Sequence, residues 1–193
     1  DRVVLLQGYG FTDIAQNRRV DAERTLFRVA SVSKPLIWTS VLQMRDRGLV
    51  DLDQDVNFYL DFRIPDTFPG RPITLRHLMT HSAGFEDFNI SSSVRTAEER
   101  VSLGETVARM LPRRVVAPGQ RTAYSNYGTA LAGYIVERVS GTPLTDYLDA
   151  NVFGPLGMTS AIMEPDESGT FSGGSLMYAT ARDWARFGLL LAD

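Results

Sequence analysis

Residues 25–47 read TLFRVASVSKPLIWTSVLQMRDR and carry the strongest structural signal in this chain. Apolar residues recur there at helical spacing, namely Leu36, Ile37, Val41 and Met44. We therefore expect a largely buried helix over residues 31–47, because this spacing places the apolar side chains on one face. Pro35 is compatible with the first turn of such a helix, and Gly48 is typical of its end.

Ser31 and Lys34 form a candidate nucleophile and base within this segment. If Ser31 opens the helix, Lys34 lies one turn later on the same face, with its amine within reach of the hydroxyl. Serine needs a nearby base to become a nucleophile, and a desolvated lysine can serve. Lys34 is the only lysine among 20 lysines and arginines, and arginine cannot release its proton near neutral pH. The alternative interpretation is a helix-capping serine beside a solvated lysine.

The tripeptide Tyr124-Ser125-Asn126 is a second candidate group, and it precedes a predicted helix. A tyrosine hydroxyl can relay a proton when a cation lies near it. The Asn126 amide can donate to a substrate carbonyl and accept from a substrate N–H. Taken alone, however, the tripeptide favours a helix cap with a packed tyrosine.

Two patterns suggest metal ligands, and both are incomplete. His77 and His81 are four residues apart, but the glutamate of the H-E-x-x-H pattern is missing between them. The acidic residues of loop 51–55 lack the glycine and the closing glutamate of a calcium loop. We therefore favour structural histidines and solvated carboxylates, and we predict no metal and no cofactor.

The composition is that of a globular protein, with 193 residues, 44% of them hydrophobic, and a net charge of −3. The charge argues against a nucleic-acid partner, which requires a basic face. No apolar run is long enough to span a bilayer, so no membrane span is expected. The absence of cysteine excludes disulfides, thiolate metal sites and a cysteine nucleophile. A secreted or periplasmic location and a cytoplasmic one both fit the sequence.

Further elements are predicted from periodicity and from Gly, Pro and capping signals. They are a strand over residues 3–9 and helices over 75–80, 97–111, 126–139, 144–150 and 179–191. One or two strands cannot form a stable sheet alone. The chain is therefore expected to obtain strands from a second chain or a C-terminal segment that completes the sheet.

Several motifs in order resemble one family of serine hydrolases. These motifs are FRVASVSK at 27–34, LRHLMTHSAG at 75–84, PG at 118–119, YSN at 124–126, PLGM at 155–158, GG at 173–174 and YATARDWARF at 178–187. The chain resembles class C β-lactamases and D-alanyl-D-alanine carboxypeptidases, which are penicillin-binding-protein-like enzymes. This group also includes family VIII-type esterases and 6-aminohexanoate-dimer hydrolase-like amidases.

The resemblance implies an α+β, β-lactamase/transpeptidase-like fold, with an antiparallel sheet flanked by helices and a mainly helical domain. Residues 1–60 would hold the N-terminal strands and the nucleophile-bearing helix of the α/β part. Residues 61–174 would form the helical domain with the Y-x-N motif, and residues 175–193 a helix returning to the α/β part. The sheet is expected to be incomplete in this chain.

The resemblance also implies the roles of four residues. Ser31 would be the acylated nucleophile, Lys34 its base, Tyr124 the proton relay and Asn126 a substrate-binding residue. The reaction would be hydrolysis of an ester, amide or β-lactam bond through an acyl-enzyme, without a cofactor.

One family motif is missing from the sequence. The third motif, K-T-G or H-x-G, has no counterpart, and the single R-x-G at 186–188 falls in a predicted helix. The resemblance implies that the family's second oxyanion-hole N–H lies in the missing C-terminal part. Members of the family start earlier and continue well beyond the last motif, so the sequence is expected to be truncated at both ends. The alternative function is therefore a non-catalytic sensor or binding domain of this fold, or an inactive fragment.

Overall fold

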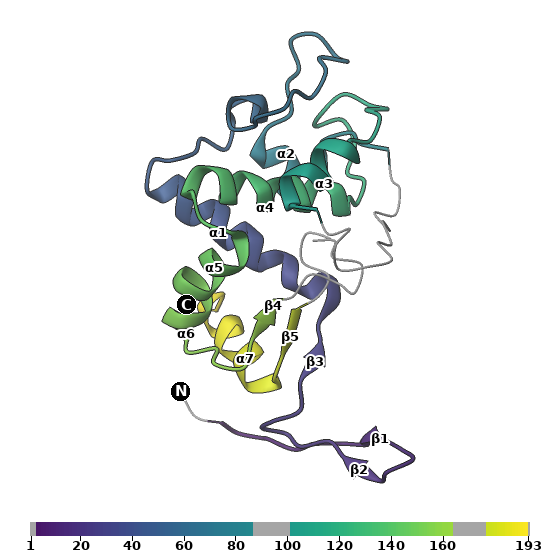
Figure 1. The fold of residues 1–193 in the computed structure, drawn as a ribbon, viewed down its shortest axis with the longest axis vertical. Helices are drawn as coiled ribbons and strands as arrows, with labels where there is room; N and C mark the ends of the chain where they lie inside the picture. Colours follow the sequence, from purple (N-terminus) through teal and green to yellow (C-terminus); the bar gives the residue numbers. More distant parts are fainter. Residues whose placement is uncertain (1–2, 87–100, 164–176, 193) are drawn as a thin grey trace.

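The computed structural model describes residues 3–86, 101–163 and 177–192. Helices dominate this part of the chain, and short antiparallel strands lie at one side of them (Figure 1). The helices are α1 (Lys34–Asp46), α2 (Leu75–Met79), α3 (Leu103–Arg109), α4 (Asn126–Ser140), α5 (Leu144–Leu148), α6 (Gly154–Leu156) and α7 (Ala181–Leu190). Shorter turns are η1 (Ala30–Ser33), η2 (Val56–Phe58) and the π turn η4 (Asp149–Phe153). The strands are β1 (Phe11–Asp13), β2 (Arg18–Arg19), β3 (Phe27–Arg28), β4 (Ile162–Met163) and β5 (Met177–Ala179).

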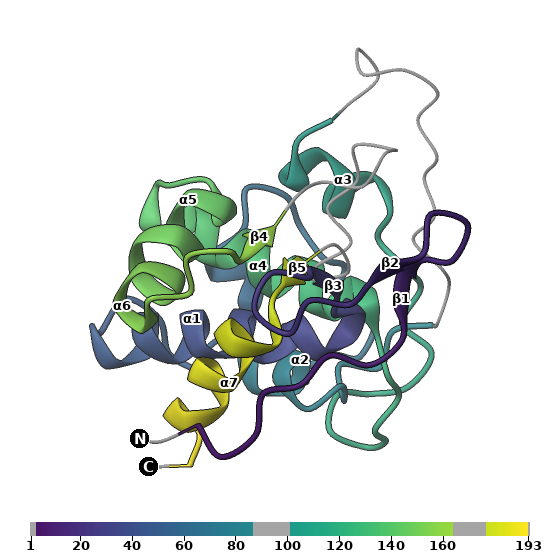
Figure 2. The same cartoon turned by 90° about the horizontal axis from the view of Figure 1, so that it is seen from below.

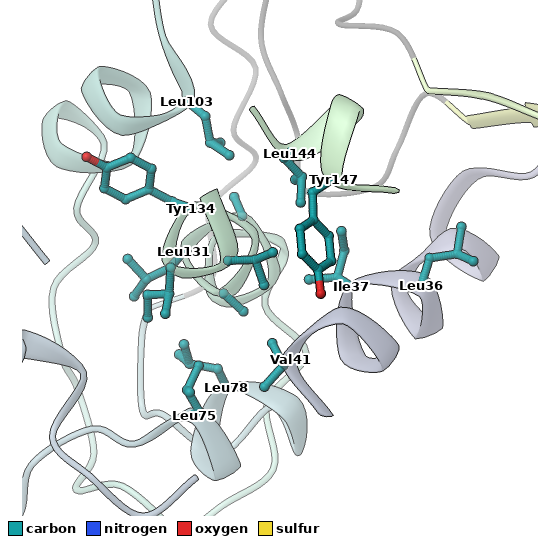
Figure 3. Packing of buried hydrophobic residues seen from close by; sticks show 14 of the residues in the cluster. Leu36, Ile37, Val41, Leu75, Leu78, Leu103, Leu131, Tyr134, Leu144 and Tyr147 are labelled. Atoms are coloured by element: carbon teal, nitrogen blue, oxygen red, sulfur yellow. The ribbon is translucent and has the colours of Figure 1, made fainter. Parts of the chain in front are cut away.

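Helix α4 is the centre of the hydrophobic core. Every residue from Tyr127 to Val136 is buried, so this helix is covered on all sides rather than along one stripe. Figure 3 shows it end-on, with apolar side chains of α1, α2, α3 and α5 around it. Gly133 permits the approach of α5, because a Cβ atom there would lie 2.8 Å from a methyl carbon of Leu144. The helix ends at Gly141, whose φ of 68° suits glycine.

Helix α1 packs against α4 through the face that the sequence predicts. Leu36, Ile37, Val41 and Met44 are all buried, which confirms the apolar pattern of this helix. The α-helical part begins three residues later than expected, at Lys34, because residues 30–33 form the tighter 3₁₀ turn η1. Ser31 therefore lies in this turn, just before the α-helix.

A three-stranded antiparallel sheet in the order β3-β5-β4 supports the start of this turn. Phe27 pairs with Ala179, and Tyr178 pairs with Ile162 on the other side. The Val29 N–H then donates to the Met177 carbonyl at 3.0 Å, so the pairing with β5 reaches the residue before η1. Figure 2 shows β4, β5 and β3 side by side in the middle of the view.

The N-terminal part of the chain extends away from the helices and differs from the prediction. Residues 3–9, expected to form a strand, have no regular secondary structure, and most of their side chains are exposed. The first strands are instead β1 and β2, which form a small hairpin with Phe11 opposite Arg19 (Figure 1). A short apolar run forms a stable strand only when a neighbouring strand pairs with it, and none of the described residues pairs with this segment.

Two helix predictions are too long at their N-terminal ends. Helix α3 begins at Leu103 because the Ser102 hydroxyl caps it by accepting from the Glu105 N–H; residues 97–100 of that prediction lie outside the described residues. Helix α7 begins at Ala181 because Thr180 caps it and Ala179 still belongs to β5. No helix in the described ranges is both long and apolar enough to cross a membrane. The three domain boundaries stay predictions.

Candidate active site

Three of the four predicted site residues meet at one oxygen atom. The Lys34 Nζ donates to Ser31 Oγ at 3.0 Å, and the Tyr124 hydroxyl donates to the same oxygen at 2.7 Å. Ser31 and Tyr124 are exposed, whereas Lys34 is buried beneath them with 3% of its surface exposed. The arrangement places a hydroxyl at the surface, with an amine and a phenol directed at its oxygen.

The backbone before Ser31 adopts an unusual conformation. Ala30 has a φ of 45°, in the left-handed region that residues with a Cβ atom seldom occupy. The buried Ser33 hydroxyl donates to the Ala30 carbonyl at 2.6 Å and holds this conformation. No side-chain capping bond is made at the start of η1 or α1, so the Ser31 hydroxyl does not act as a helix cap. The capping interpretation of Ser31 is therefore wrong.

Lys34 makes its contacts near Ser31 and Tyr124. None of the ion pairs formed among the described residues includes it. Its Nζ instead lies 4.9 Å from the centroid of the Tyr124 ring and contacts Ser31 Oγ. The solvated lysine of the alternative interpretation is thus also wrong.

The segment carrying Tyr124 is held against the loop after α2. The Ala123 N–H donates to the His81 carbonyl at 2.7 Å, and the Ser125 N–H donates to His81 Nδ1 at 3.3 Å. The Ser125 hydroxyl caps α4 by accepting from the Gly128 N–H at 3.0 Å, as the sequence suggests. Asn126 is the half-buried first residue of α4, and no hydrogen bond within the described ranges joins its side chain to Ser31, Lys34 or Tyr124.

His81 also lies at this site, next to Tyr124, and the sequence did not predict this position. Its ring lies 4.6 Å from the Tyr124 ring, centroid to centroid, and the two planes are inclined by 35°. Burial and the charge of Lys34 hold the pKa of His81 below its ordinary value. The position of His81 inside the quoted motif at residues 75–84 was the one available signal.

The residues considered as metal ligands have other partners. His77 belongs to the capping box of α2, where its Nδ1 accepts from the Thr74 N–H at 3.2 Å. Asp53 pairs with Arg76 at 2.7 Å, and Asp55 caps η2. Across the described ranges, no group of three or more potential ligands could hold a metal ion.

The curated proteins that are similar to this chain have names that describe different activities. Penicillin-binding protein 4* of Bacillus subtilis is 25% identical over 154 residues, which cover 78% of this chain and 33% of that protein. Esterase EstB of Burkholderia gladioli is 34% identical over 151 residues, which cover 70% of this chain and 38% of that protein. The chain thus spans about a third of the length of these relatives.

Solved structures confirm the fold class. An octameric penicillin-binding protein homologue from Pyrococcus abyssi superposes with a TM-score of 0.81 at 22% identity, covering 96% of this chain and 49% of that one. A D-amino acid amidase from Ochrobactrum anthropi has a TM-score of 0.75 at 27% identity, covering 95% of this chain and 59% of that one. These folds, like the helices and small antiparallel sheets here, are those of the predicted α+β class. A family model described as beta-lactamase matches residues 1–193, and the chain therefore belongs to the β-lactamase family of serine hydrolases.

Proposed function

We propose that this protein cleaves ester or amide bonds through an acyl-enzyme formed on Ser31. The observation that carries this proposal is the convergence of Lys34 Nζ and the Tyr124 hydroxyl on Ser31 Oγ, at 3.0 and 2.7 Å. A serine hydroxyl is a weak nucleophile unless a base removes its proton, and a general base must lie within hydrogen-bond reach. Lys34 and Tyr124 both meet that distance.

In the proposed acylation step, the unprotonated Lys34 amine takes the Ser31 hydroxyl proton as Oγ attacks the substrate carbonyl. The C–O bond forms, and the carbonyl electron pair moves onto its oxygen. The tetrahedral intermediate then collapses, and Tyr124 donates its proton to the leaving oxygen or nitrogen while Lys34 returns a proton to Tyr124. The result is an ester of Ser31, one released alcohol or amine, and neutral catalytic groups.

Deacylation uses water as the nucleophile and the same pair of groups. Tyr124 passes its proton to the neutral Lys34 amine and accepts one from the water molecule that attacks the ester. Lys34 then returns a proton to Oγ as Ser31 leaves, so the carboxylic acid is released and both groups are neutral again. Asn126 begins α4 two residues after Tyr124, and we assign it the binding of the substrate carbonyl or amide. No cofactor takes part in this scheme.

The names of the relatives support ester and amide substrates over a single narrow specificity. One is an esterase at 34% identity, and one solved neighbour at 27% identity is a D-amino acid amidase. Small differences in a pocket decide between such substrates, since one methylene is worth about 1–3 kcal/mol of discrimination. We therefore propose a broad ester or amide hydrolase, with β-lactams as poorer substrates.

The proposal is tested by intact-mass spectrometry after incubation with a fluorophosphonate and, separately, with a penicillin. A single adduct that peptide mapping places on Ser31 is expected with the fluorophosphonate. Ser31→Ala should form no adduct, and Lys34→Arg should be nearly as inactive because the positive charge stays while the base is lost. Ser140→Ala, at the far end of α4, is the matched control and should label normally.

Two outcomes would overturn the proposal. Normal labelling of Lys34→Arg would remove Lys34 from the mechanism. Absence of any adduct on wild-type protein that is demonstrably folded would favour the alternative, a non-catalytic sensor or binding domain of this fold or an inactive fragment. Hydrolysis of nitrophenyl esters, nitroanilides and nitrocefin would then rank the three substrate classes in an enzyme that does label.

A further inference from the structure

His81 contacts the chain on both sides of Tyr124. Its carbonyl accepts from the N–H of Ala123, the residue before Tyr124, at 2.7 Å. Its ring Nδ1 accepts from the N–H of Ser125, the residue after Tyr124, at 3.3 Å. One residue thus binds both neighbours of the tyrosine whose hydroxyl donates to Ser31.

The ring of His81 also lies between Tyr124 and helix α1. It packs against the Tyr124 ring at 4.6 Å between centroids. Its other ring contact is an edge-on one with Trp38, at 6.1 Å. Trp38 follows Lys34 by four residues on α1, so the helix that holds Lys34 also positions His81.

The backbone of His81 is adapted to this position. Its φ of 53° is in the left-handed region, which is unfavourable for a residue with a Cβ atom. Such strain persists only where surrounding contacts enforce it, and it often marks a functional site. Here the bonds that close the end of α2 enforce it, because the His81 N–H donates to the Leu78 carbonyl at 3.1 Å and the Ser82 N–H donates to the His77 carbonyl at 2.8 Å. The end of α2 thus fixes the backbone of the residue that contacts Ala123 and Ser125.

We propose that His81 is a positioning residue for acylation, which holds the Tyr124 hydroxyl against Ser31 through its carbonyl and its unprotonated Nδ1. This inference rests on the proposed hydrolase function. It assigns His81 no contact with the substrate and no proton transfer. A ring nitrogen that accepts a hydrogen bond carries no proton, so the ring is neutral and its hydrogen resides on Nε2.

Protonation of His81 would disturb the site in two ways. It would turn Nδ1 into a donor that faces the Ser125 N–H, and it would place a positive charge close to the Lys34 amine. Lys34 of α1 and Tyr124 are the titratable groups that face the ring; Trp38 and Ser125 supply its uncharged contacts. Burial and the Lys34 charge both lower the pKa of His81, which keeps the ring neutral at neutral pH.

The test compares two variants that fit the left-handed backbone. His81→Gly relieves the strain and keeps the carbonyl, but it removes the ring acceptor. His81→Asn tolerates the same φ and carries an amide oxygen bonded to Cγ, where histidine has Nδ1. His77→Asn is the matched control, because His77 also accepts a backbone N–H through Nδ1 but serves the cap of α2.

The measured quantity is the rate of fluorophosphonate labelling of Ser31 as a function of pH. His81→Gly should label roughly 10- to 100-fold more slowly than wild type, the range expected for a misplaced catalytic group. His81→Asn should recover most of that rate. The acid-side fall in rate should steepen below the pKa of His81 in wild type and in His77→Asn, but not in His81→Asn.

Failure of this inference differs from failure of the proposed function. Equal rates and pH profiles for wild type, His81→Gly and His81→Asn would overturn the role of His81 while the hydrolase function stands. A rate for His81→Asn as low as that of His81→Gly would also overturn the role of Nδ1. Absence of wild-type labelling would overturn the function itself. Independently of activity, nitrogen NMR at neutral pH should show Nδ1 of His81 unprotonated, and a protonated Nδ1 would contradict the inference.

Discussion

The helical region around α4 buries its apolar side chains, whereas the N-terminal region before Ala30 leaves most of its aliphatic side chains exposed. Leu131 at the centre of α4 has no exposed surface, whereas Val4 is 85% exposed and Leu5 is 74% exposed. Both regions are rich in aliphatic side chains. The difference is that α1, α2, α3 and α5 pack around α4 in one core, while strand pairing in the described part of the N-terminal region is limited to the β1–β2 hairpin and β3.

This contrast explains where the candidate site is built. Lys34 lies on α1, and Tyr124 lies immediately before α4, so two helices that pack against each other hold these groups. Sites carried by packed elements keep their geometry better than sites carried by loops. The N-terminal region contributes the strand β3 that leads into the Ser31 turn, but none of the three converging side chains.

The largest expected effect is that of a cavity in the helical region. Leu131→Ala removes a fully buried side chain whose neighbours come from several helices, so the space cannot close easily. Such changes cost about 2–5 kcal/mol of the free energy of unfolding. Urea denaturation followed by circular dichroism measures it. A loss below about 1 kcal/mol would mean that the core around α4 is loosely packed.

The loss of a helix cap should have the next largest effect. Ser125→Ala leaves the buried Gly128 N–H without its acceptor, which is expected to cost about 1 kcal/mol of unfolding free energy. Asp21→Ala is the matched change in the exposed N-terminal region, where the Asp21 carboxylate accepts from the N–H groups of Glu23 and Arg24. Its cost should be only a few tenths of a kcal/mol, since water replaces those bonds. Equal losses in the two variants would contradict the contrast.

A smaller effect is expected from pH, and it belongs to the helical region alone. Both histidines of the chain lie there, and burial lowers the pKa of each below the ordinary value of 6.5. As pH falls below 6.5, the histidines of the unfolded chain become protonated, whereas those of the folded protein stay neutral because their pKa values are lower. Proton binding therefore favours the unfolded state. The contribution of the two histidines to the free energy of unfolding should therefore be greatest above pH 6.5. It should be lost as pH falls from 6.5 through the lower pKa values of the folded histidines.

The double variant His77→Asn/His81→Asn is the control for this pH dependence. Its free energy of unfolding should change less than that of wild type between pH 7 and about pH 5, a range that lies above the ordinary carboxylate pKa values. An unchanged slope in this variant would show that other groups cause the dependence. Denaturant titrations at several pH values provide the measurement.

The smallest effect is expected for the exposed aliphatic residues. Leu5→Ala removes a side chain that is already 74% exposed, so the free energy of unfolding should change by less than about 0.5 kcal/mol. The measurement is the same urea titration as for Leu131→Ala. A loss above 1 kcal/mol would break the contrast, because it would show that another surface covers this segment in solution.

Local patterns in the sequence located the helices, although α1, α3 and α7 begin later than predicted. The apolar spacing of residues 36–44 predicted the buried face of α1, and the tripeptide at 124–126 indicated the cap of α4, which Ser125 forms. These signals work because a helix is defined by contacts within a few residues. The strand prediction for residues 3–9 was wrong because a strand needs a partner, and an apolar run in the sequence does not show whether a partner is present.

The sequence by itself determined that Ser31 and Lys34 lie within reach of each other, since three residues of helical chain fix their separation. Only the tertiary structure brought in Tyr124, which lies 93 residues after Ser31 and reaches it because α1 and α4 pack together. The same packing placed His81 behind Tyr124 and gave it both neighbouring backbone N–H groups. Contacts across such distances depend on how buried surfaces fit together, and no local spacing in the chain specifies that fit.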